Sequence, residues 1–260
     1  MKSISLSKPI NICGRRIKNR IVVPPMSDFG TVAPDGLVHQ SHIDRYEAYA
    51  KSGAGLIIIE ACSVLRMPEN RDTLCLENDD CIPGIKSIAD IIHHYSAVTL
   101  VQIMLTGLET MEEKKISEIS RDDFLRYKEA FISAAIRCQK AGADILDVSS
   151  GIARYSNIPN NFLYDSKIYA ASLVKNHAHI PVICVGNIFT GNIGESIIDN
   201  EYADMIAVGR GHLSDPAWAN KTLAGVPVNQ CLQCKNCLWW IDGNLCAARR
   251  KEKQKNGISS

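Results

Sequence analysis

Residues 55–61 read GLIIIEA, and this short stretch decides the fold class. A run of consecutive apolar, largely β-branched residues is typical of a strand that is covered on both faces. Strands of that kind belong to parallel sheets, in which helices pack on each side. The residues just before it, 42–52 (HIDRYEAYAKS), have a helical pattern that stops at Gly53. The stretch therefore predicts a helix followed by a buried parallel strand.

The same alternation of strand and helix continues in both directions along the chain. Strands are predicted at residues 21–25, 55–61, 98–104, 145–149, 181–186 and 204–209. Helices are predicted at residues 42–52, 83–95, 121–141, 164–177, 192–200 and 215–224. Repeats of this kind with short loops form right-handed βαβ units. We expect an α/β fold with about six strand-helix units in residues 1–225, a cysteine-rich segment at 226–248 and a frayed polar tail at 249–260.

The composition excludes several classes of protein. The chain has 260 residues, of which 46% are hydrophobic and 22% charged, which is ordinary for a globular protein. Its net charge of +1 offers no basic footprint for nucleic acid or an anionic membrane. The longest apolar stretches, 53–65 and 97–108, are too short to cross a bilayer. Ten cysteines behind an N-terminus without a signal peptide predict reduced thiols and a cytoplasmic protein.

Four of the ten cysteines are crowded together near the C-terminal end, as Cys231-x2-Cys234-x2-Cys237-x8-Cys246. Three thiolates on one tight loop and a fourth on the return suit a [4Fe–4S] cluster. Zinc usually takes two separated Cys-x2-Cys pairs, so zinc and uncoordinated thiols are the alternatives. Trp239 and Trp240, inside this loop, are expected to pack the loop onto the barrel or to serve as a shield or docking surface for an electron partner. The other six cysteines are predicted to be small buried residues.

Two predicted strands end in glycine-bearing loops, Val185-Gly186-Asn187-Ile188 and Val208-Gly209-Arg210-Gly211. Near the end of a β/α barrel, backbone N–H groups of such a pair of loops hold phosphates, and an arginine adds a charged contact. Plain turn chemistry is the alternative for both loops. His212 follows directly and could join the phosphate site or not.

Together these segments resemble the old yellow enzyme family of FMN-dependent oxidoreductases, in its iron–sulfur branch with 2,4-dienoyl-CoA reductase and trimethylamine dehydrogenase. The resemblance implies a TIM-type parallel β/α barrel followed by a small iron–sulfur loop. The segments that carry it are Asn19-Arg20, Pro25-Met26-Ser27, residues 42–61, Gln102, Gly107, 181–188, 203–210, Asp215-Pro216 and the four clustered cysteines.

The resemblance also implies FMN as cofactor and NAD(P)H as a source of electrons. Pro25, Met26 and Ser27 would line the isoalloxazine ring, and Ala61 would pack beside it. Gln102 would bind the pyrimidine edge of the flavin, because a buried amide needs partners; a structural hydrogen bond in the core is the alternative. The phosphate would be held by Gly186, Asn187, Gly209 and Arg210.

The sequence also departs from the family pattern. The family barrel has eight strands, and a strand-helix-strand stretch is missing before residue 145, together with the fifth-strand arginine that faces the flavin. Ser149 and Ile152 stand where the family has a His/His or His/Asn pair that binds the substrate carbonyl. Arg154 and Tyr155 could replace the lost groups as anion clamp and proton donor, or form an ordinary surface loop.

These observations predict an FMN- and [4Fe–4S]-dependent oxidoreductase that acts on an unidentified small-molecule substrate. One alternative is a subunit that relays electrons to a partner protein, which could also be the electron donor. The other is a degenerate, non-catalytic barrel. Because an incomplete barrel exposes apolar strand edges, we expect a homo-oligomer or a hetero-complex that covers the gap; a reduced barrel that closes within one chain is the alternative.

Overall fold

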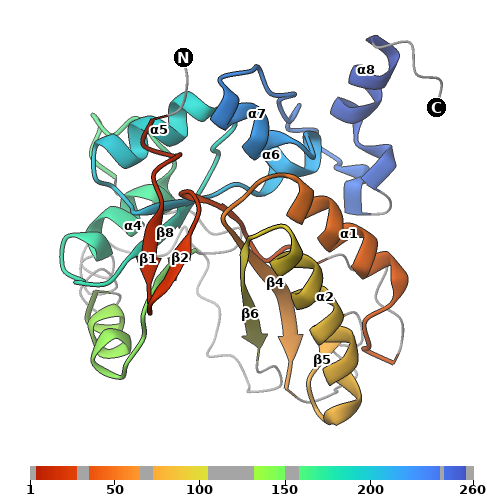
Figure 1. Ribbon diagram of the computed structural model, residues 1–260. Coiled ribbons are helices and arrows are strands. Elements are labelled where there is room, and N and C mark those ends of the chain that lie inside the picture. The colour runs from red at the N-terminus through yellow and green to blue at the C-terminus, as the bar shows by residue number, and fades with distance from the viewer. Residues whose placement is uncertain are drawn as a thin grey trace.

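The computed structural model describes residues 4–27, 35–64, 73–104, 132–149, 158–240 and 243–255. Its centre is a curled parallel sheet with helices on the outer side (Figure 1). All six predicted strands are found in this sheet. The predicted α/β class is therefore confirmed.

In the described residues, seven parallel strands form the sheet in the order β5-β4-β3-β9-β8-β7, and β6 also pairs with β4. Their bounds are β3 (Ile21–Val23), β4 (Leu56–Ser63), β5 (Leu74–Cys75), β6 (Val98–Met104), β7 (Leu146–Val148), β8 (Val182–Val185) and β9 (Met205–Ala207). The first of these, β3, lies between β4 and the last, β9, as the closure of a barrel requires. Between β6 and β7 no pairing is found in the described ranges, so this part of the chain forms a curled half-barrel.

A hairpin that the sequence analysis did not predict precedes the sheet. Strands β1 (Ile10–Ile12) and β2 (Arg15–Ile17) pair antiparallel. The turn between them is Cys13-Gly14, with φ of 49° and 72°. Two successive positive φ values are the signature of the tight turn that fits the twist of a hairpin. Ile17 packs with Val22 and Leu56, so the hairpin contributes to the core inside the sheet.

The helices follow the predicted order with small changes at their ends. Their bounds are α1 (Gln40–Lys51), α2 (Ile82–His94), α4 (Ser166–Lys175), α5 (Gly191–Asp199), α6 (Gly209–Ser214), α7 (Trp218–Ala224) and α8 (Ala247–Lys255). Residues 132–140 are also helical, and the rest of the predicted helix 121–141 is mostly outside the described residues. Single 3₁₀ turns lie at η2 (Asp79–Cys81), η4 (Leu238–Trp240) and η5 (Gly243–Leu245).

Two of the predicted element bounds were wrong. The strand expected at 204–209 ends at Ala207, and a helix, α6, begins at Gly209. The helix expected at 215–224 begins only at Trp218, because Asp215-Pro216 separates α6 from α7. Proline lacks a backbone N–H and disfavours helical conformation in the residue before it, so Asp215 is extended.

Side chains alternate between two apolar cores along each strand, as the period of a strand requires. On β4, Leu56 and Ile58 join a small core inside the curl with Ile183, Met205 and Ala207. Ile57 and Ile59 point the other way, into the larger core between the sheet and the helices. The continuous apolar run of the sequence is thus explained by burial on both faces.

The C-terminal segment is fastened to α6 and α7. The buried carboxylate of Asp215 accepts hydrogen bonds from the backbone N–H of Asn229 at 2.7 Å and from Lys221 Nζ at 2.7 Å. Arg249 Nε donates to the carbonyl of Leu213 at 2.5 Å. Residues 249–255 were predicted to be frayed, which is wrong: they belong to α8, because Ala248 and Arg249 hold its first turn against the protein. Figure 1 shows α8 beside the C-terminal end of the chain.

Among the described residues, the structure contains no helix with the length and apolar character that a membrane crossing needs.

Candidate functional site

A cavity of about 620 Å³ opens where the carboxyl ends of β3, β6, β7, β8 and β9 meet. This end of a parallel barrel is where the loops after the strands gather side chains from distant parts of the sequence. Seven of the residues that the resemblance assigns to the flavin line it: Pro25, Met26, Gln102, Gly186, Asn187, Gly209 and Arg210. Tertiary folding therefore brings the predicted flavin residues to one place.

The segment after β3 forms an apolar wall of the cavity, made by Pro24, Pro25 and Met26. It lies close to the loop after β9. A Cβ atom at Gly209 would be 3.3 Å from Met26 Sδ and 3.4 Å from Pro24 Cγ. A glycine at position 209 therefore allows the loop after β9 to lie against the segment after β3 without a steric clash.

The loop after β8 is built on backbone that favours small or amide residues. Gly186 has φ of 145° and Asn187 has φ of 48°. A Cβ atom at Gly186 would lie 2.8 Å from Asp165 Cβ, closer than real contacts allow. Asn187 Nδ2 donates to Asp165 Oδ2 at 2.6 Å, while Asp165 Oδ1 accepts from the backbone N–H of Lys167 at 3.0 Å and caps α4. The glycine is thus required by both conformation and space.

Arg210 stands at the mouth of the cavity on the first turn of α6. Its Nη2 donates to Asn187 Oδ1, and its guanidinium lies 4.9 Å from the centre of the Phe189 ring. The aromatic face and the amide hold the side chain in place while it remains exposed. A guanidinium held in this way can bind an anionic oxygen with its other N–H groups.

Gln102 is not a structural core residue. The sequence analysis expected a buried amide, but the Gln102 side chain is exposed and lines the cavity. The reason is that β6 has a paired neighbour on β4 alone among the described strands, so its inner face is open. The amide is therefore accessible to a molecule bound in the cavity.

The other residues that were predicted to bind the flavin or to take part in catalysis are not all part of the cavity lining. Ser27 and Ala61 are half-buried and are not among the described residues that line the cavity. Ser149, where the family has one of its paired residues, does line it. Arg154 and Tyr155, like Ile152, lie outside the described residues.

Asp147 on β7 also lines the cavity, and the sequence analysis did not single it out. The residue is exposed where it faces the hollow of the cavity. Desolvation by the protein atoms around it raises the pKa of the Asp147 carboxyl to about 6. The signal that could have revealed it is the single acid in the apolar run Ile145-Leu146-Asp147-Val148.

His212 does not belong to this site. Its side chain is buried, its Nδ1 donates to the carbonyl of Val208 at 2.6 Å, and its ring lies beside that of Trp218. Burial lowers the pKa of His212 to about 4, so the ring is neutral at pH 7. Of the two alternatives that the sequence left open for His212, the structure favours a structural role over a part in the phosphate site.

The four clustered cysteines are free thiols on the C-terminal segment. Cys231 and Cys246 are half-buried, whereas Cys234 and Cys237 are exposed. Cys231 Sγ accepts a hydrogen bond from the backbone N–H of Gln233 at 3.4 Å. Within the described ranges no three His, Cys, Asp or Glu side chains are grouped closely enough to hold a metal ion. The cluster therefore stays a prediction.

Burial of Trp239 and of the six cysteines outside the C-terminal cluster agrees only in part with the prediction. Trp239 is buried, which confirms that it packs the cysteine-rich loop onto the protein. Of the six remaining cysteines, Cys62, Cys75 and Cys184 are buried as predicted. Cys81 is half-buried. For Cys13 and Cys138 the prediction was wrong, because both are exposed, Cys13 in the hairpin turn.

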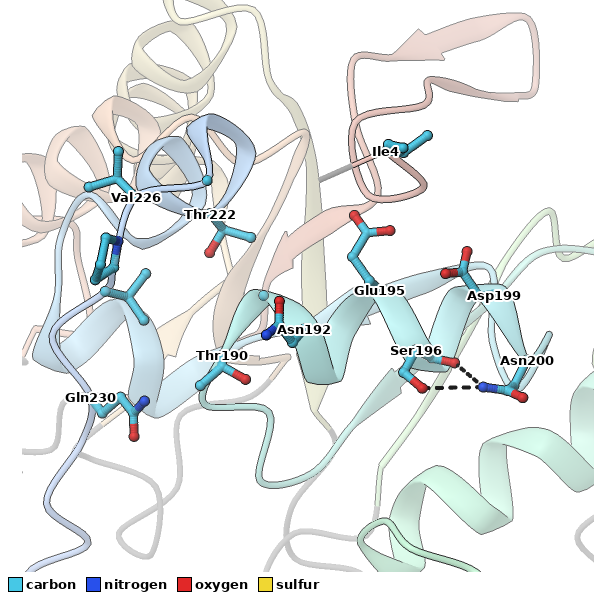
Figure 2. Close-up of a pocket in the computed structure, with 14 residues that line it drawn as sticks. Ile4, Thr190, Asn192, Glu195, Ser196, Asp199, Asn200, Thr222, Val226 and Gln230 are labelled. Atoms are coloured by element: carbon cyan, nitrogen blue, oxygen red, sulfur yellow. Dashed lines mark hydrogen bonds between the residues drawn. The ribbon is translucent and has the colours of Figure 1, made fainter. Parts of the chain in front are cut away.

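A second cavity of about 660 Å³ lies between α5 and residues 225–230 (Figure 2). Its acidic groups already serve the N-terminal segment. The Glu195 carboxylate accepts the backbone N–H groups of Ser5 and Leu6 at 2.9 and 3.1 Å, and Asp199 accepts the Ser5 hydroxyl at 2.6 Å. Figure 2 shows Glu195 directed from α5 toward the N-terminal segment. These carboxylates have a structural explanation, so the candidate site is the cavity at the strand ends.

Comparison with known proteins identifies the family of this chain. Residues 5–118 and 151–229 match the model of the NADH:flavin oxidoreductase / NADH oxidase family. The chain belongs to this family. An NADH oxidase of Thermoanaerobacter brockii is 24% identical over 334 residues, an alignment that covers 84% of this chain and 51% of that protein. An NADPH dehydrogenase of Bacillus pumilus is 30% identical over 161 residues, covering 55% of this chain and 47% of that protein.

Solved structures agree in fold. Morphinone reductase in complex with tetrahydroNAD has a TM-score of 0.56 at 15% identity, over 92% of this chain and 97% of that one. A variant of NCR from Zymomonas mobilis has a TM-score of 0.57 at 16% identity, over 92% and 98% of the two chains. This member of the family spans about half the length of the two curated relatives. The predicted TIM-type fold and flavin oxidoreductase family are thus confirmed.

Proposed function

We propose that the chain is an FMN-dependent oxidoreductase that takes electrons from NAD(P)H and passes them to a small-molecule acceptor. The observation that carries this proposal is the cavity at the strand ends, which gathers seven of the residues that the family resemblance assigns to FMN. The family and the names of its relatives, NADH oxidase and NADPH dehydrogenase, support NAD(P)H as the donor.

The residues present fit FMN. The cavity volume of about 620 Å³ falls within the range of small-molecule sites. Arg210 supplies a guanidinium suited to one terminal phosphate. Pro25 and Met26 supply an apolar surface on which a flat ring can stack, and the accessible amide of Gln102 matches the donors and acceptors of a pyrimidine edge. When bound, the flavin supplies hydride chemistry. The chain's own residues bind it, orient it and enclose the reacting atoms.

A [4Fe–4S] cluster on Cys231, Cys234, Cys237 and Cys246 is part of this proposal. Four thiolates are the usual donor set of such a cluster. The N–H group that points at Cys231 Sγ is the kind of hydrogen bond that stabilises a thiolate ligand. Two of the sulfurs are exposed and two half-buried, so the segment must tighten around a cluster. Bound there, the cluster would transfer single electrons.

We also propose that the barrel is shorter than that of its relatives. The family model matches in two blocks that are separated by residues 119–150. The sequence analysis placed the missing strand-helix-strand stretch in this same interval. With it go the family's fifth-strand arginine and its paired carbonyl-binding residues. An acceptor that needs little activation of a carbonyl is therefore favoured as substrate.

A visible absorption spectrum of the anaerobically purified protein tests the proposal. Flavin bands that bleach on addition of NADPH, with an underlying broad cluster absorption, are expected. Cys234→Ser should then remove most of the iron and acid-labile sulfide. Cys138→Ser, an exposed cysteine outside the segment, is the matched control and should keep both. A colourless protein that holds only zinc and does not take up FMN would overturn the proposal in favour of a degenerate barrel.

An electron-transfer subunit is the second candidate function, and one observation favours it. Helix α8 follows the cysteine segment and exposes Arg250, Lys251, Lys253 and Lys255. A basic surface next to exposed cysteines would steer an acidic electron carrier toward the cluster. Turnover of NADPH with ferricyanide separates the candidates when it is compared with small organic acceptors. Reduction of ferricyanide alone favours the relay, and reduction of both favours the oxidoreductase.

A further inference from the structure

Asp147 occupies a position on the inner face of the half-barrel. In the parallel pair β7–β8, Asp147 is opposite Ile183, and Val148 is opposite Cys184. Val148 and Leu146 pack into the outer core between sheet and helices, whereas Ile183 belongs to the inner core. Because side chains alternate along a strand, Asp147 points inward, toward the cavity that it lines.

The surroundings of Asp147 are those of a proton-transfer group. The inner layer of the sheet is otherwise apolar here, with Ile183, Ala207 and Val185 on the next strands. The described part of the chain gives Asp147 no hydrogen bond or ion pair. Asp147 is exposed to the hollow of the cavity, and desolvation by the protein atoms around it raises its pKa to about 6, close enough to neutral pH that either protonation state can be reached.

Other titratable groups face the same space. Asp165, Lys167 and Arg210 line the cavity from the start of α4 and from α6. Cys184 on β8 is near Asp147 but packs into the outer core, on the other face of the sheet. Asp165 is occupied by Asn187 and by the cap of α4, and Arg210 is held by Asn187 and Phe189. Burial and the nearby Asp147 charge raise the pKa of the Cys184 thiol, which stays protonated. Among the described residues that line the cavity, Asp147 is thus the acid without a structural task.

We propose that Asp147 carries the proton of the reaction: it takes up a proton when the bound flavin is reduced and gives it to the acceptor. The inference rests on the proposed function, since it needs FMN in this cavity. It concerns one residue of this chain that the family resemblance did not assign.

The chemistry balances. NAD(P)H would give up a hydride, which consists of one proton and two electrons, and leave as NAD(P)⁺; FMN, when bound, would supply the hydride chemistry between donor and acceptor. The acceptor needs one more proton to become the neutral product. Asp147 takes up that proton from the solution, because the negative charge that arrives with the hydride raises the pKa of a nearby carboxyl. Its O–H bond then breaks as a new bond from hydrogen to the acceptor forms, and the carboxylate is restored.

Infrared difference spectroscopy of the FMN-loaded protein tests the proposal without a substrate. Reduction by NADPH at pH 7 should produce a C=O band of a protonated carboxylic acid in the wild type. The band should be lost in Asp147→Asn and shifted in Asp147→Glu. It should be unchanged in Asp144→Asn, a matched control three residues earlier on the exposed approach to β7. Proton uptake on reduction, followed with a pH indicator in weak buffer, should fall in Asp147→Asn alone.

The outcomes are distinct. A carboxylic acid band that persists in Asp147→Asn, or a wild type without one, overturns the role of Asp147 while FMN and NADPH reduction remain intact. A wild type that binds no FMN overturns the proposed function instead, and the role of Asp147 falls with it. If Asp147→Asn fails to fold, the frequency shift in Asp147→Glu decides the assignment.

Discussion

Arg210 shows how a single residue is prepared for a ligand. Its guanidinium is held by Asn187 and Phe189, and Asn187 is in turn held by Asp165, so three elements fix one exposed charge. Long side chains lose rotamer freedom when they bind, and a residue that is already held loses less. The position of this charge at the cavity mouth is therefore a property of the whole loop cluster.

Arg210→Ala should weaken the retention of FMN. Removing a charge-assisted contact to a phosphate costs about 1.5–3 kcal/mol, or roughly a 10- to 150-fold rise in the dissociation constant. Fluorescence titration of the apoprotein with FMN measures this. Arg250→Ala, an exposed arginine on α8, is the control and should bind FMN as the wild type does. Equal affinities in the two variants would contradict the assignment of Arg210.

His212 predicts a pH dependence of stability. Its pKa is about 4 in the folded protein, below the value of about 6.5 for an unfolded chain. Between these values the unfolded chain binds a proton that the folded one does not, so stability falls as the pH drops below 6.5. From pH 7 to pH 5 the loss should be about 2 kcal/mol, from 1.36 kcal/mol per unit.

Urea denaturation at pH 7 and pH 5 measures the effect of His212. His212→Gln should be less stable at pH 7, because the packing against Trp218 is lost, but should lose less stability between pH 7 and pH 5. An unchanged pH dependence in this variant would show that other groups cause it.

At the scale of elements, the junction of α6, α7 and the C-terminal segment connects the cysteine-rich segment to the rest of the protein. Ser214 Oγ donates to the carbonyl of Asn229 at 2.9 Å, and Asn229 Nδ2 donates to the carbonyl of Ser214 at 3.0 Å. Asp215 adds the contacts to Asn229 and Lys221 described above. This network joins the cysteine segment to the helix that carries Arg210, so cavity and cysteines share one support.

Asp215→Asn should loosen the C-terminal segment. Asp215 Oδ2 accepts from Asn229 and Lys221, and Oδ1 accepts from the backbone N–H of Ala217. An amide must turn its NH₂ group toward one of these donors, and it lacks the charge that pairs with Lys221. We expect a loss of about 2–3 kcal/mol in the free energy of unfolding, from hydrogen bonds to a buried charge. Limited proteolysis should cut residues 226–255 faster in this variant.

Asp90→Asn is the control for that experiment. Asp90 pairs with Lys86 on α2, and both side chains are mostly exposed. Exposed pairs of this kind contribute little, so the variant should remain within about 0.5 kcal/mol of the wild type. If Asp215→Asn were as stable as this control, Asp215 would not hold the C-terminal segment in place.

At the scale of the whole molecule, the main feature is that β6 and β7 are not paired with each other among the strands that the structure describes. Ile103 and Val101 on β6 are 66% and 37% exposed, although both belong to a parallel strand. Parallel strands are normally covered on both faces, and an exposed edge invites another chain. A second subunit along the edge of β6 that no described strand pairs with would also lie beside the cavity, which Gln102 lines from the opposite face of the strand.

The FMN-loaded protein should therefore be at least a dimer in solution, which light scattering measures directly. Ile103→Lys should shift it toward the monomer, because a charge is costly in a buried interface. Ile82→Lys, an equally apolar exposed position at the start of α2, is the control and should leave the mass unchanged. A monomer that binds FMN would instead mean that the reduced barrel closes within one chain.

Much of the fold followed from the sequence alone. The strands, the order of the helices and the two glycine loops are local properties, decided by apolar periodicity and by residues such as Gly186 that few others can replace. The hairpin β1–β2 was missed because its strands are short, and the break before α7 because a helical pattern continues past Pro216. The site residues from Pro25 to Arg210 were found through family resemblance.

Burial, pKa and access to the cavity depended on the tertiary structure and could not be predicted from local sequence patterns. Whether Gln102 is buried depends on the strands beside β6, and whether His212 reaches a phosphate depends on how α6 packs against Trp218. Asp147 became a candidate only when the pairing of β7 with β8 turned it inward. Propensity and periodicity act over a few residues, whereas burial, pKa and access to a cavity depend on groups far apart in the chain, which only folding brings together.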